Sequence, residues 1–307
     1  MGETNISPAF RSYIRLLRPK QWIKNFFVFA PLIFARELFN PDLLLDAVRA
    51  FLAFCLSASA VYVLNDIADA EEDRVHPQKR NRPIASGAIT VRRGYAIAII
   101  LIAADIPLVF GMDRRFVVCL ASYFLLNFAY SFKLKEVVLL DVFIVAAGFM
   151  LRVLGGAYAI SVSVSSWIVL CTLFISLFLS FAKRRGELVT SQESGSLTQR
   201  KVLLLYNVQF LDQMLTITAA GAVISYALYT VAPRTVEIYG TDKMIYTTVF
   251  VLYGVFRYLH MVHSGVSTEN PTNAVTSDLT ILATGVLWII ACIILIYFGG
   301  HIPFLSR

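Results

Sequence analysis

The feature that most constrains this sequence is a series of long apolar runs separated by polar segments. A helix that crosses a bilayer needs about 20 mostly apolar residues, and nine runs approach that length. Their approximate limits are 22–39, 43–64, 94–112, 115–132, 137–159, 163–182, 213–232, 244–262 and 279–298. Of the 307 residues, 58% are hydrophobic and only 15% are charged, whereas a soluble domain carries about 25% charged residues. We therefore predict an all-α membrane protein with nine transmembrane helices, which excludes an ordinary soluble enzyme.

The basic excess of the chain, +7 at neutral pH, fits a membrane orientation better than nucleic-acid binding. Lys and Arg gather at the cytoplasmic ends of membrane spans. With nine spans, 19 of these residues fall on the side of the N-terminus and 7 on the other side. We expect a single membrane domain over 1–307, whose N-terminal segment 1–21 is cytoplasmic or interfacial. The long loops 65–93 and 183–212 are also expected in the cytoplasm, where they can cap a cavity.

An acidic motif at the end of the second apolar run is the strongest local signal. Asn65, Asp69 and Asp73 are spaced by four residues, so they lie on one face of a helix. Asp66 lies three residues before Asp69, on a neighbouring stripe. Carboxylates this close repel one another unless a cation lies between them, and oxygen ligands select a hard ion such as Mg²⁺. The motif therefore predicts a Mg²⁺ site for a phosphate-bearing substrate, with a solvated acidic helix end as the alternative.

Cationic residues follow the acidic motif closely. Lys79, Arg80 and Arg82 come six to nine residues after Asp73. A metal–diphosphate pair requires carboxylates for the metal and cations for the remaining phosphate oxygens. The alternative is a basic loop that only sets the membrane orientation.

Further polar residues lie inside the apolar runs or at their ends. Asp141 and Arg152 share a helical face in the fifth run, about 16 Å apart along the axis. Because an arginine within a membrane is costly and faces a polar cavity or a partner, we expect Arg152 to orient a phosphate or to pair with Asp141. The alternative is a structural ion pair with another span. Candidates for binding a polyanionic substrate at the ends of the first, fourth and sixth runs are Lys24, Asn25, Tyr130, Lys133, Lys135, Lys183, Arg184 and Glu187.

The acidic motif, read as Asn65-Asp66-x-x-Asp69-x-x-x-Asp73, resembles the NDxxDxxxD motif of the UbiA superfamily of intramembrane prenyltransferases. Its position after the second of nine spans matches as well, and the resemblance covers essentially the whole chain. The resemblance implies a helical bundle around a central cavity that cytoplasmic loops cap. It also implies that the four motif residues hold Mg²⁺ on a diphosphate.

The sequence departs from the members of this superfamily that transfer prenyl groups. Those members carry a second Asp-rich motif after the sixth span, where residues 183–187 of this chain read KRRGE. Their Tyr-x-x-x-Lys signature is altered too, because Tyr130 is followed by lysines three and five residues later. The altered pattern is similar to the decaprenyl-phosphate phosphoribosyltransferase branch, as are the segments 17–25 and 73–84.

The branch resemblance implies that a polyprenyl phosphate attacks C1 of phosphoribosyl diphosphate (PRPP) and releases diphosphate. Asp66, Asp69 and Asp73 are then the catalytic, Mg²⁺-holding residues. A bacterial plasma membrane location and a role in supplying an arabinan precursor for the cell wall follow from the same resemblance. Two alternatives remain open: transfer of a prenyl group from a diphosphate to an aromatic acceptor, and a lipid-phosphate carrier or transporter. A homo-oligomer is as compatible with the sequence as a monomer.

Overall fold

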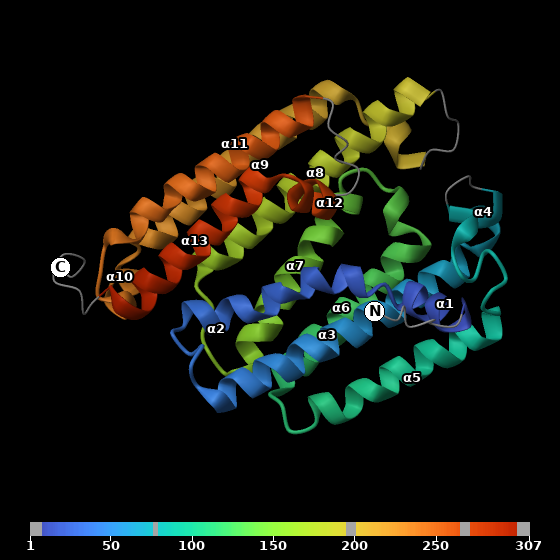
Figure 1. Cartoon of the computed structure of the whole chain (residues 1–307), viewed down its shortest axis with the longest axis horizontal. Coiled ribbons are helices and arrows are strands. Elements are labelled where there is room, and N and C mark those ends of the chain that lie inside the picture. Colours follow the sequence, from blue (N-terminus) through green and yellow to red (C-terminus); the bar gives the residue numbers. More distant parts are fainter. Residues whose placement is uncertain (1–7, 76–78, 195–200, 265–270, 300–307) are drawn as a thin grey trace, which may run out of the picture. The chain divides into compact units, whose positions relative to one another are not determined.

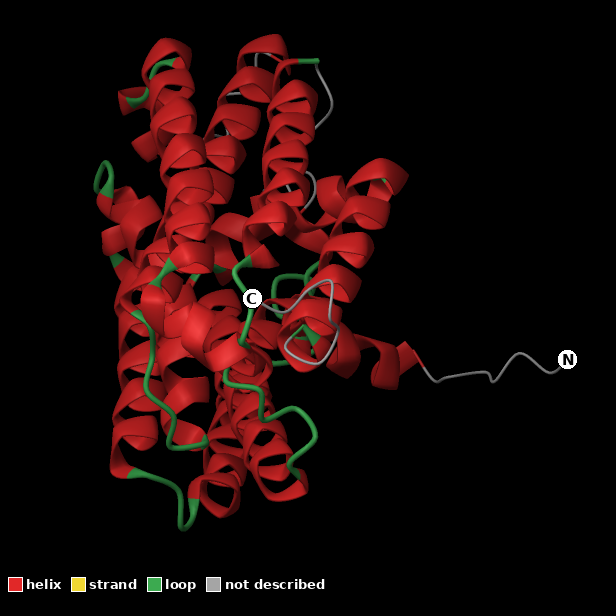
Figure 2. Cartoon of the chain, turned by 90° about the vertical axis from the view of Figure 1, so that its left-hand side faces the viewer, coloured by secondary structure: helices red, strands yellow, loops and turns green. Residues whose placement is uncertain are grey.

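The computed structural model describes residues 8–75, 79–194, 201–264 and 271–299, and within them every regular element is a helix (Figures 1 and 2). The predicted all-α class is thereby confirmed. The parts of the predicted cap loops at 76–78 and 195–200, and residues 1–7 of the N-terminal segment, lie outside the described residues.

The chain divides into two compact units. The first unit consists of Met1–Leu32, Asn40–Lys135 and Leu151–Ser163, and the second of Ile33–Phe39, Glu136–Met150 and Val164–Arg307. The chain passes from one unit to the other within three helical elements. These are α2 (Ala30–Phe34), the 3₁₀-helix η3 (Leu134–Glu136) and α7 (Leu140–Ala159).

The first unit is organised around its longest helix, α3. Its other elements are α1 (Pro8–Leu17), the 3₁₀-helix η1 (Pro19–Phe29), α4 (Ala70–Val75), the 3₁₀-turn η2 (Lys79–Asn81), α5 (Val91–Val109) and α6 (Arg114–Phe132). Helix α3 (Pro41–Ala68) begins after Asn40, whose side chain caps the amide of Leu43, and it packs against α1, η1, α5 and α6 (Figure 1). The core around it contains Phe54 and Phe116, which are fully buried.

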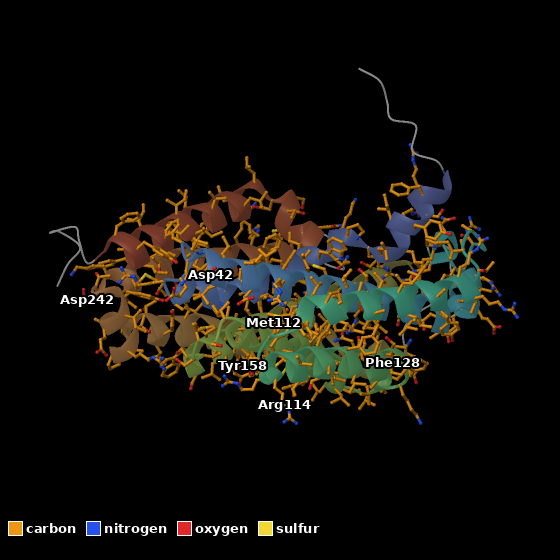
Figure 3. The ribbon with its side chains drawn as sticks, turned by 90° about the horizontal axis from the view of Figure 1, so that it is seen from below. Asp42, Met112, Arg114, Phe128, Tyr158 and Asp242 are labelled. Atoms are coloured by element: carbon orange, nitrogen blue, oxygen red, sulfur yellow. The ribbon has the colours of Figure 1, made fainter. Side chains whose placement is uncertain are left out.

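The turn between α5 and α6 shows how the sequence ends one helix and starts the next. Gly111 adopts φ +77°, a conformation that favours glycine, and so lets the chain reverse. Asp113 then caps α6, because its carboxylate accepts the amide of Arg115 at 2.7 Å. Figure 3 shows this turn at Met112 and Arg114, with the Arg114 side chain extending outward. The turn agrees with the predicted spans 94–112 and 115–132.

A glycine brings α7 unusually close to η1 within the first unit. A Cβ atom at Gly156 would collide with the backbone carbonyl of Val28. The neighbouring Gly155 is similarly confined, because a Cβ atom added there would lie 2.8 Å from the ring of Phe54. This contact holds the 3₁₀ backbone of η1 against α7, close to Asn25 and Arg152.

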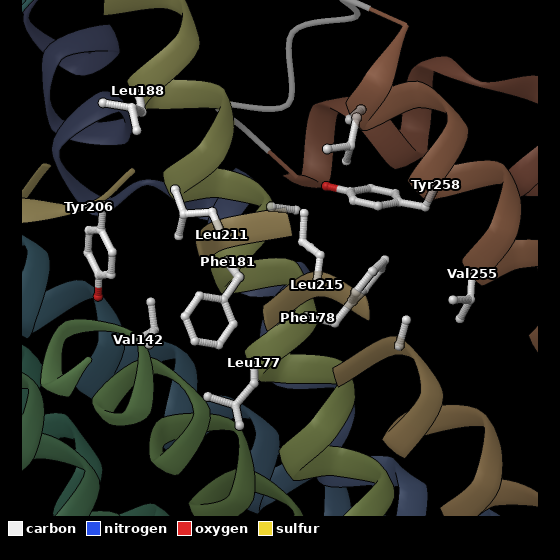
Figure 4. Close-up of a cluster of buried hydrophobic side chains, with 14 of the residues drawn as sticks. Val142, Leu177, Phe178, Phe181, Leu188, Tyr206, Leu211, Leu215, Val255 and Tyr258 are labelled. Atoms are coloured by element: carbon white, nitrogen blue, oxygen red, sulfur yellow. The ribbon is translucent and has the colours of Figure 1, made fainter. Parts of the chain in front are cut away.

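The second unit is a group of helices around a large apolar core. Its elements after α7 are α8 (Ser166–Ser194), η4 (Lys201–Leu205), α9 (Val208–Val231), α10 (Pro233–Tyr239), η5 (Lys243–Thr247), α11 (Thr248–His263), α12 (Pro271–Ser277) and α13 (Leu279–Phe298). Helix α9 packs along α8 and α11, and α13 packs on α11. Figure 4 shows the core, in which Phe178 and Tyr258 meet edge to face with ring centroids 5.4 Å apart.

Seven helical stretches within the described residues have the length and apolar composition of a membrane span. They are Pro41–Ala68, Arg114–Phe132, Leu140–Ala159, Ser166–Gln192, Val208–Val231, Lys243–His263 and Leu279–Phe298. The chain is thus a multi-pass membrane protein. The predicted span 94–112 corresponds to α5, which carries Arg92, Arg93 and Asp105 within 19 residues. The predicted span 22–39 divides into η1 and α2, so the count of nine crossings stays a prediction.

Candidate functional site

The acidic motif lies where α3 ends and α4 begins, in the first unit. The amide of Asp69 bonds to the carbonyl of Asn65 at 2.9 Å, and the amide of Asp73 bonds to the carbonyl of Asp69 at 2.8 Å. These bonds of helical spacing place Asn65, Asp69 and Asp73 on one face, as their spacing predicts. Asp66 and Asp73 are almost completely buried, at 1% exposure each, whereas the Asp69 side chain is 19% exposed.

Three cationic side chains are paired with these carboxylates. Arg82 Nη1 bridges Asp73 Oδ2 at 2.7 Å and Asp66 Oδ1 at 3.3 Å. Lys135 Nζ contacts Asp69 Oδ1 at 2.9 Å, and the side-chain amide of Asn65 donates to Asp69 Oδ2 at 3.1 Å. The third cation, Arg18, contacts Asp66 Oδ1 at 2.5 Å. The structure therefore brings Arg82 and Lys135, two of the predicted substrate-binding residues, to the acidic motif.

Arg18 was missed by the sequence reasoning, although it lies in the basic N-terminal segment. Of the other predicted cations, Lys79 and Arg80 lie in η2, and the Arg80 side chain is exposed. Lys133 is also exposed, and Tyr130 is half-buried near the end of α6. Of the two lysines after Tyr130, the later one therefore reaches the acidic motif.

Arg152 is buried in the first unit and makes directed hydrogen bonds. Its Nε donates to Asn25 Oδ1 at 2.7 Å, and its Nη2 donates to the hydroxyl of Tyr123 at 2.8 Å. The guanidinium also lies 4.5 Å from the centroid of the Tyr123 ring. Asn25 in turn donates to Cys55 Sγ at 3.2 Å. The sequence did not predict that Asn25 and Arg152 meet; the half-buried Lys24 of η1 precedes Asn25 in the chain.

Asp141 has partners in the second unit that the sequence did not suggest. Arg184 Nε donates to Asp141 Oδ2 at 2.5 Å, and the Tyr206 hydroxyl donates to Asp141 Oδ1 at 2.7 Å. The same hydroxyl accepts the amide of Leu139 at 2.8 Å. Burial, reinforced by the hydrogen bond to Asp141, raises the pKa of Tyr206, so the hydroxyl stays protonated at neutral pH. No motif pointed to Tyr206, because it follows a short apolar stretch without charged neighbours at helical spacing.

The basic cluster 183–185 lies within α8, because this helix continues to Ser194 and does not give way to the predicted loop at residue 183. The network around Asp141 divides the cluster. The Arg184 side chain is only 4% exposed, and its Nη1 contacts Glu187 Oε2 at 2.6 Å. Lys183 is 38% exposed, with its Nζ 3.7 Å from Glu187 Oε1. Arg185 contacts Asp212 at 2.6 Å. Arg184 therefore serves to hold the start of α7 against α8, whereas Lys183 lies toward the surface.

The acidic motif is chemically suited to a hard divalent cation, although the carboxylates now bind cationic side chains. Among the described residues, no three carboxylate, His or Cys side chains converge closely enough to hold a metal ion as they stand. Asp66 Oδ2 is nevertheless buried and has no hydrogen-bond partner in the described part of the chain, which is unusual for a buried oxygen. The all-oxygen donor set of Asn65, Asp66, Asp69 and Asp73 matches the ligands of Mg²⁺.

Known proteins resemble this chain over most of its length. Residues 26–274 match the UbiA prenyltransferase family. Curated relatives include the decaprenyl-phosphate phosphoribosyltransferases of Corynebacterium glutamicum and Mycolicibacterium smegmatis, which are 40% and 36% identical to it over 220 residues. The matched region is 70% of this chain in both comparisons, and 66% and 69% of these relatives.

The fold also matches a solved structure of a UbiA homologue. The protein from Archaeoglobus fulgidus, bound to GPP and Mg²⁺, superimposes with a TM-score of 0.70 at 20% sequence identity. The match covers 93% of this chain and 99% of that protein. At this identity the likeness concerns the fold.

Proposed function

The chain belongs to the UbiA prenyltransferase family, and we propose that it transfers the 5-phosphoribosyl group of PRPP to a polyprenyl phosphate such as decaprenyl phosphate. The relatives named decaprenyl-phosphate phosphoribosyltransferase support this reaction. The observation that carries it is the ion pair of Arg184 with Asp141 and Glu187. It stands where prenyl-transferring members of the family place a second Asp-rich motif, so a two-metal prenyl diphosphate site is disfavoured.

The acidic motif and its cations are assigned to the diphosphate of PRPP. Arg82 and Lys135 contact carboxylates of the motif, which supports a role for both in binding diphosphate oxygens beside these carboxylates. Asn65, Asp66, Asp69 and Asp73 would hold Mg²⁺. Bound Mg²⁺ would neutralise the negative charge that develops on the departing diphosphate.

The transfer itself needs no general base. An oxygen of the lipid phosphate, already anionic at neutral pH, forms a bond to C1 of the ribose. The bond between C1 and the diphosphate oxygen breaks, and its electron pair leaves with the diphosphate. Arg82 and Lys135 stabilise that charge by hydrogen bonds that strengthen as it grows. The main task of the protein is to bring a soluble polyanion and a lipid phosphate together.

The remaining cationic residues are assigned to the other phosphates. Arg152 and Asn25 form a buried donor group in the first unit, and Lys24 adds an ammonium beside them. In the second unit we assign phosphate binding to Lys183, because Arg184 is buried in its ion pair. Lys79 and Arg80 in the loop after α4, and Lys133 after Tyr130, are assigned to the capture of the incoming polyanion.

The location of the reaction follows from the charge distribution. The excess of Lys and Arg on the side of the N-terminus favours a cytoplasmic face for the acidic motif. We propose the plasma membrane of a bacterium as the location, since the curated relatives named above are bacterial.

The test uses purified protein in detergent with Mg²⁺, ribose-labelled PRPP and a polyprenyl phosphate. The expected product is a labelled lipid that organic solvent extracts, together with released diphosphate, and both disappear with EDTA. A prenyl diphosphate with an aromatic acid serves as the competing substrate pair. Prenylation of that acid without a phosphoribosyl lipid would contradict the proposal. A lipid-phosphate carrier would release no diphosphate in either assay.

A further inference from the structure

We propose that Arg18 is an exchangeable counter-ion of Asp66. It neutralises this carboxylate while no metal is bound, and it turns to a diphosphate oxygen when a metal–diphosphate pair enters. The inference rests on the proposed function, because it concerns the same acidic motif. It adds a residue from outside the motif and an order of events, in which metal and diphosphate bind together.

Arg18 is held by two side chains of α3. Its Nη2 contacts Asp66 Oδ1 at 2.5 Å, and its guanidinium carbon lies 4.9 Å from the centroid of the Tyr62 ring. Tyr62 and Asp66 are four residues apart, so they form adjacent positions on one helical face. The Arg18 side chain is 25% exposed, whereas that of Asp66 is 1% exposed. The Asp66 side chain is thus enclosed by the protein, whereas the Arg18 side chain is able to move toward solvent.

The backbone of Arg18 has a conformation that is unusual for a residue other than glycine. The residue adopts φ +52° and ψ +54°, immediately before Pro19. For a residue other than glycine this left-handed conformation is unfavourable, so surrounding contacts must impose it. Ser59 supplies them from α3: its hydroxyl donates to the carbonyl of Leu17 at 2.9 Å and accepts from Trp22 Nε1 at 3.0 Å. The chain is therefore anchored on both sides of Arg18.

Asp66 carries more positive partners on one oxygen than it needs. Arg18 and Arg82 both contact Oδ1, at 2.5 and 3.3 Å, while Oδ2 is buried without a hydrogen-bond partner in the described part of the chain. Two guanidinium groups on one oxygen repel each other, and an unpaired buried carboxylate oxygen is costly. A divalent cation on Asp66 and a phosphate oxygen for the displaced guanidinium would remove both defects.

The charges of the cluster explain why metal and diphosphate should enter together. The ion pairs match three carboxylates, Asp66, Asp69 and Asp73, with three cations, Arg18, Arg82 and Lys135. A metal ion alone adds positive charge to this balanced group and competes with the cations already there. A metal with diphosphate brings compensating negative charge, to which the displaced arginine can bind in its preferred planar geometry. Binding of each is therefore coupled favourably to the other.

The test measures metal binding directly, with Mn²⁺ as the probe and its electron paramagnetic resonance signal as the readout. In the unmodified chain, inorganic diphosphate is expected to tighten Mn²⁺ binding at least about tenfold. Arg18→Gln is expected to bind Mn²⁺ alone at least about threefold more tightly, because a competing charge is lost. The same variant should bind diphosphate in the presence of Mn²⁺ about tenfold more weakly, because a charge-assisted hydrogen bond is lost.

Two further variants control for charge and folding. Arg15→Gln removes the same charge from exposed α1, where Arg15 Nη2 lies 3.4 Å from the carbonyl of Asn81, and should leave both affinities unchanged. Arg18→Lys keeps the charge and should keep the weak binding of Mn²⁺ alone. The inference is overturned if Arg18→Gln weakens Mn²⁺ binding or changes neither affinity. If Arg18→Gln does not fold, the absence of coupling in the unmodified chain overturns it.

The outcomes also separate this inference from the proposed function. Opposite shifts of the two affinities without a phosphoribosyl lipid product would support the role of Arg18 and remove the proposed transfer. Product formation with unchanged affinities in Arg18→Gln would leave the transfer and remove the role of Arg18.

Discussion

Arg184 and Asp141 form an ion pair that is almost completely shielded from solvent, with side-chain exposures of 4% and 0%. The pair joins the C-terminal half of α8 to the start of α7, and Tyr206 completes it by donating to the second carboxylate oxygen. It belongs to the second unit alone. A buried ion pair of this kind fixes the relative placement of two helices, since each charge depends on the other.

Asp141→Asn should therefore destabilise the protein strongly. Removing one partner of a buried ion pair costs about 3–5 kcal/mol, because the other charge stays buried without compensation. Chemical unfolding in detergent measures the change. Asp212→Asn is the matched control, because the Asp212 side chain is 35% exposed and its partner Arg185 also lies on α8. That change should cost no more than about 1 kcal/mol, and equal losses in the two variants would contradict the structural role of Asp141.

The acidic motif offers a second prediction, on activity rather than stability. Asp66→Asn and Asp69→Asn should each lower product formation at least about a hundredfold, because each removes a charged oxygen from the expected Mg²⁺ ligands. Glu71→Gln and Glu72→Gln are the controls, since both side chains are exposed on α4 beside the motif. The assay is diphosphate release from PRPP with a polyprenyl phosphate. Near-normal rates in both aspartate variants, or equal losses in the glutamate variants, would remove the metal assignment.

The two lysines after α6 should behave differently. Lys135 contacts Asp69 at 2.9 Å, whereas Lys133 is exposed. Lys135→Ala is expected to raise the KM for PRPP about tenfold or more, because a charge-assisted contact to the diphosphate is worth about 1.5–3 kcal/mol. Lys133→Ala should change KM less than about threefold, as expected for a screened surface charge. If Lys133→Ala raised the KM for PRPP more than Lys135→Ala does, Lys133 and not Lys135 would be the lysine that binds the diphosphate.

Sequence reasoning identified those parts of the site that follow from local spacing. Asn65, Asp69 and Asp73 lie on one face because the helical repeat requires it, and the backbone bonds between them confirm this. The all-α class followed from apolar runs in the same way. Partners that are distant in sequence left no such signal: Arg184 meets Asp141 from 43 residues away, and local periodicity does not encode which helices pack together.

The first predicted span shows the other limit of sequence reasoning. Residues 22–39 read as one apolar run, but the structure has the 3₁₀-helix η1 up to Phe29 and the short helix α2 after it. The amide of Ala30 bonds to Phe27, three residues back. The tighter 3₁₀ winding accompanies the close approach of Gly156 to Val28. Such a tertiary contact overrides the preference of the segment for a regular α-helix.

The close approach at Gly156 leads to a final prediction, in which two similar changes should have opposite signs. Alanine is favoured over glycine inside a helix by about 0.8–1.0 kcal/mol. At Gly254 in α11 an added Cβ meets nothing within 4 Å, so Gly254→Ala should stabilise the protein or leave it unchanged. At Gly156 the Cβ would collide with the Val28 carbonyl, and backbone cannot move aside as a flexible side chain does. Gly156→Ala should therefore lower the unfolding temperature in detergent.

The same change should disturb the nearby polar group. Moving η1 away from α7 would lengthen the hydrogen bond from Arg152 to Asn25, which is 2.7 Å. Gly156→Ala is thus expected to raise the KM for PRPP or for the lipid phosphate at temperatures where the protein is still folded, whereas Gly254→Ala should leave both values unchanged. Equal unfolding temperatures for the two variants would show that η1 accommodates the added methyl group, and the constraint inferred from Gly156 would then be wrong.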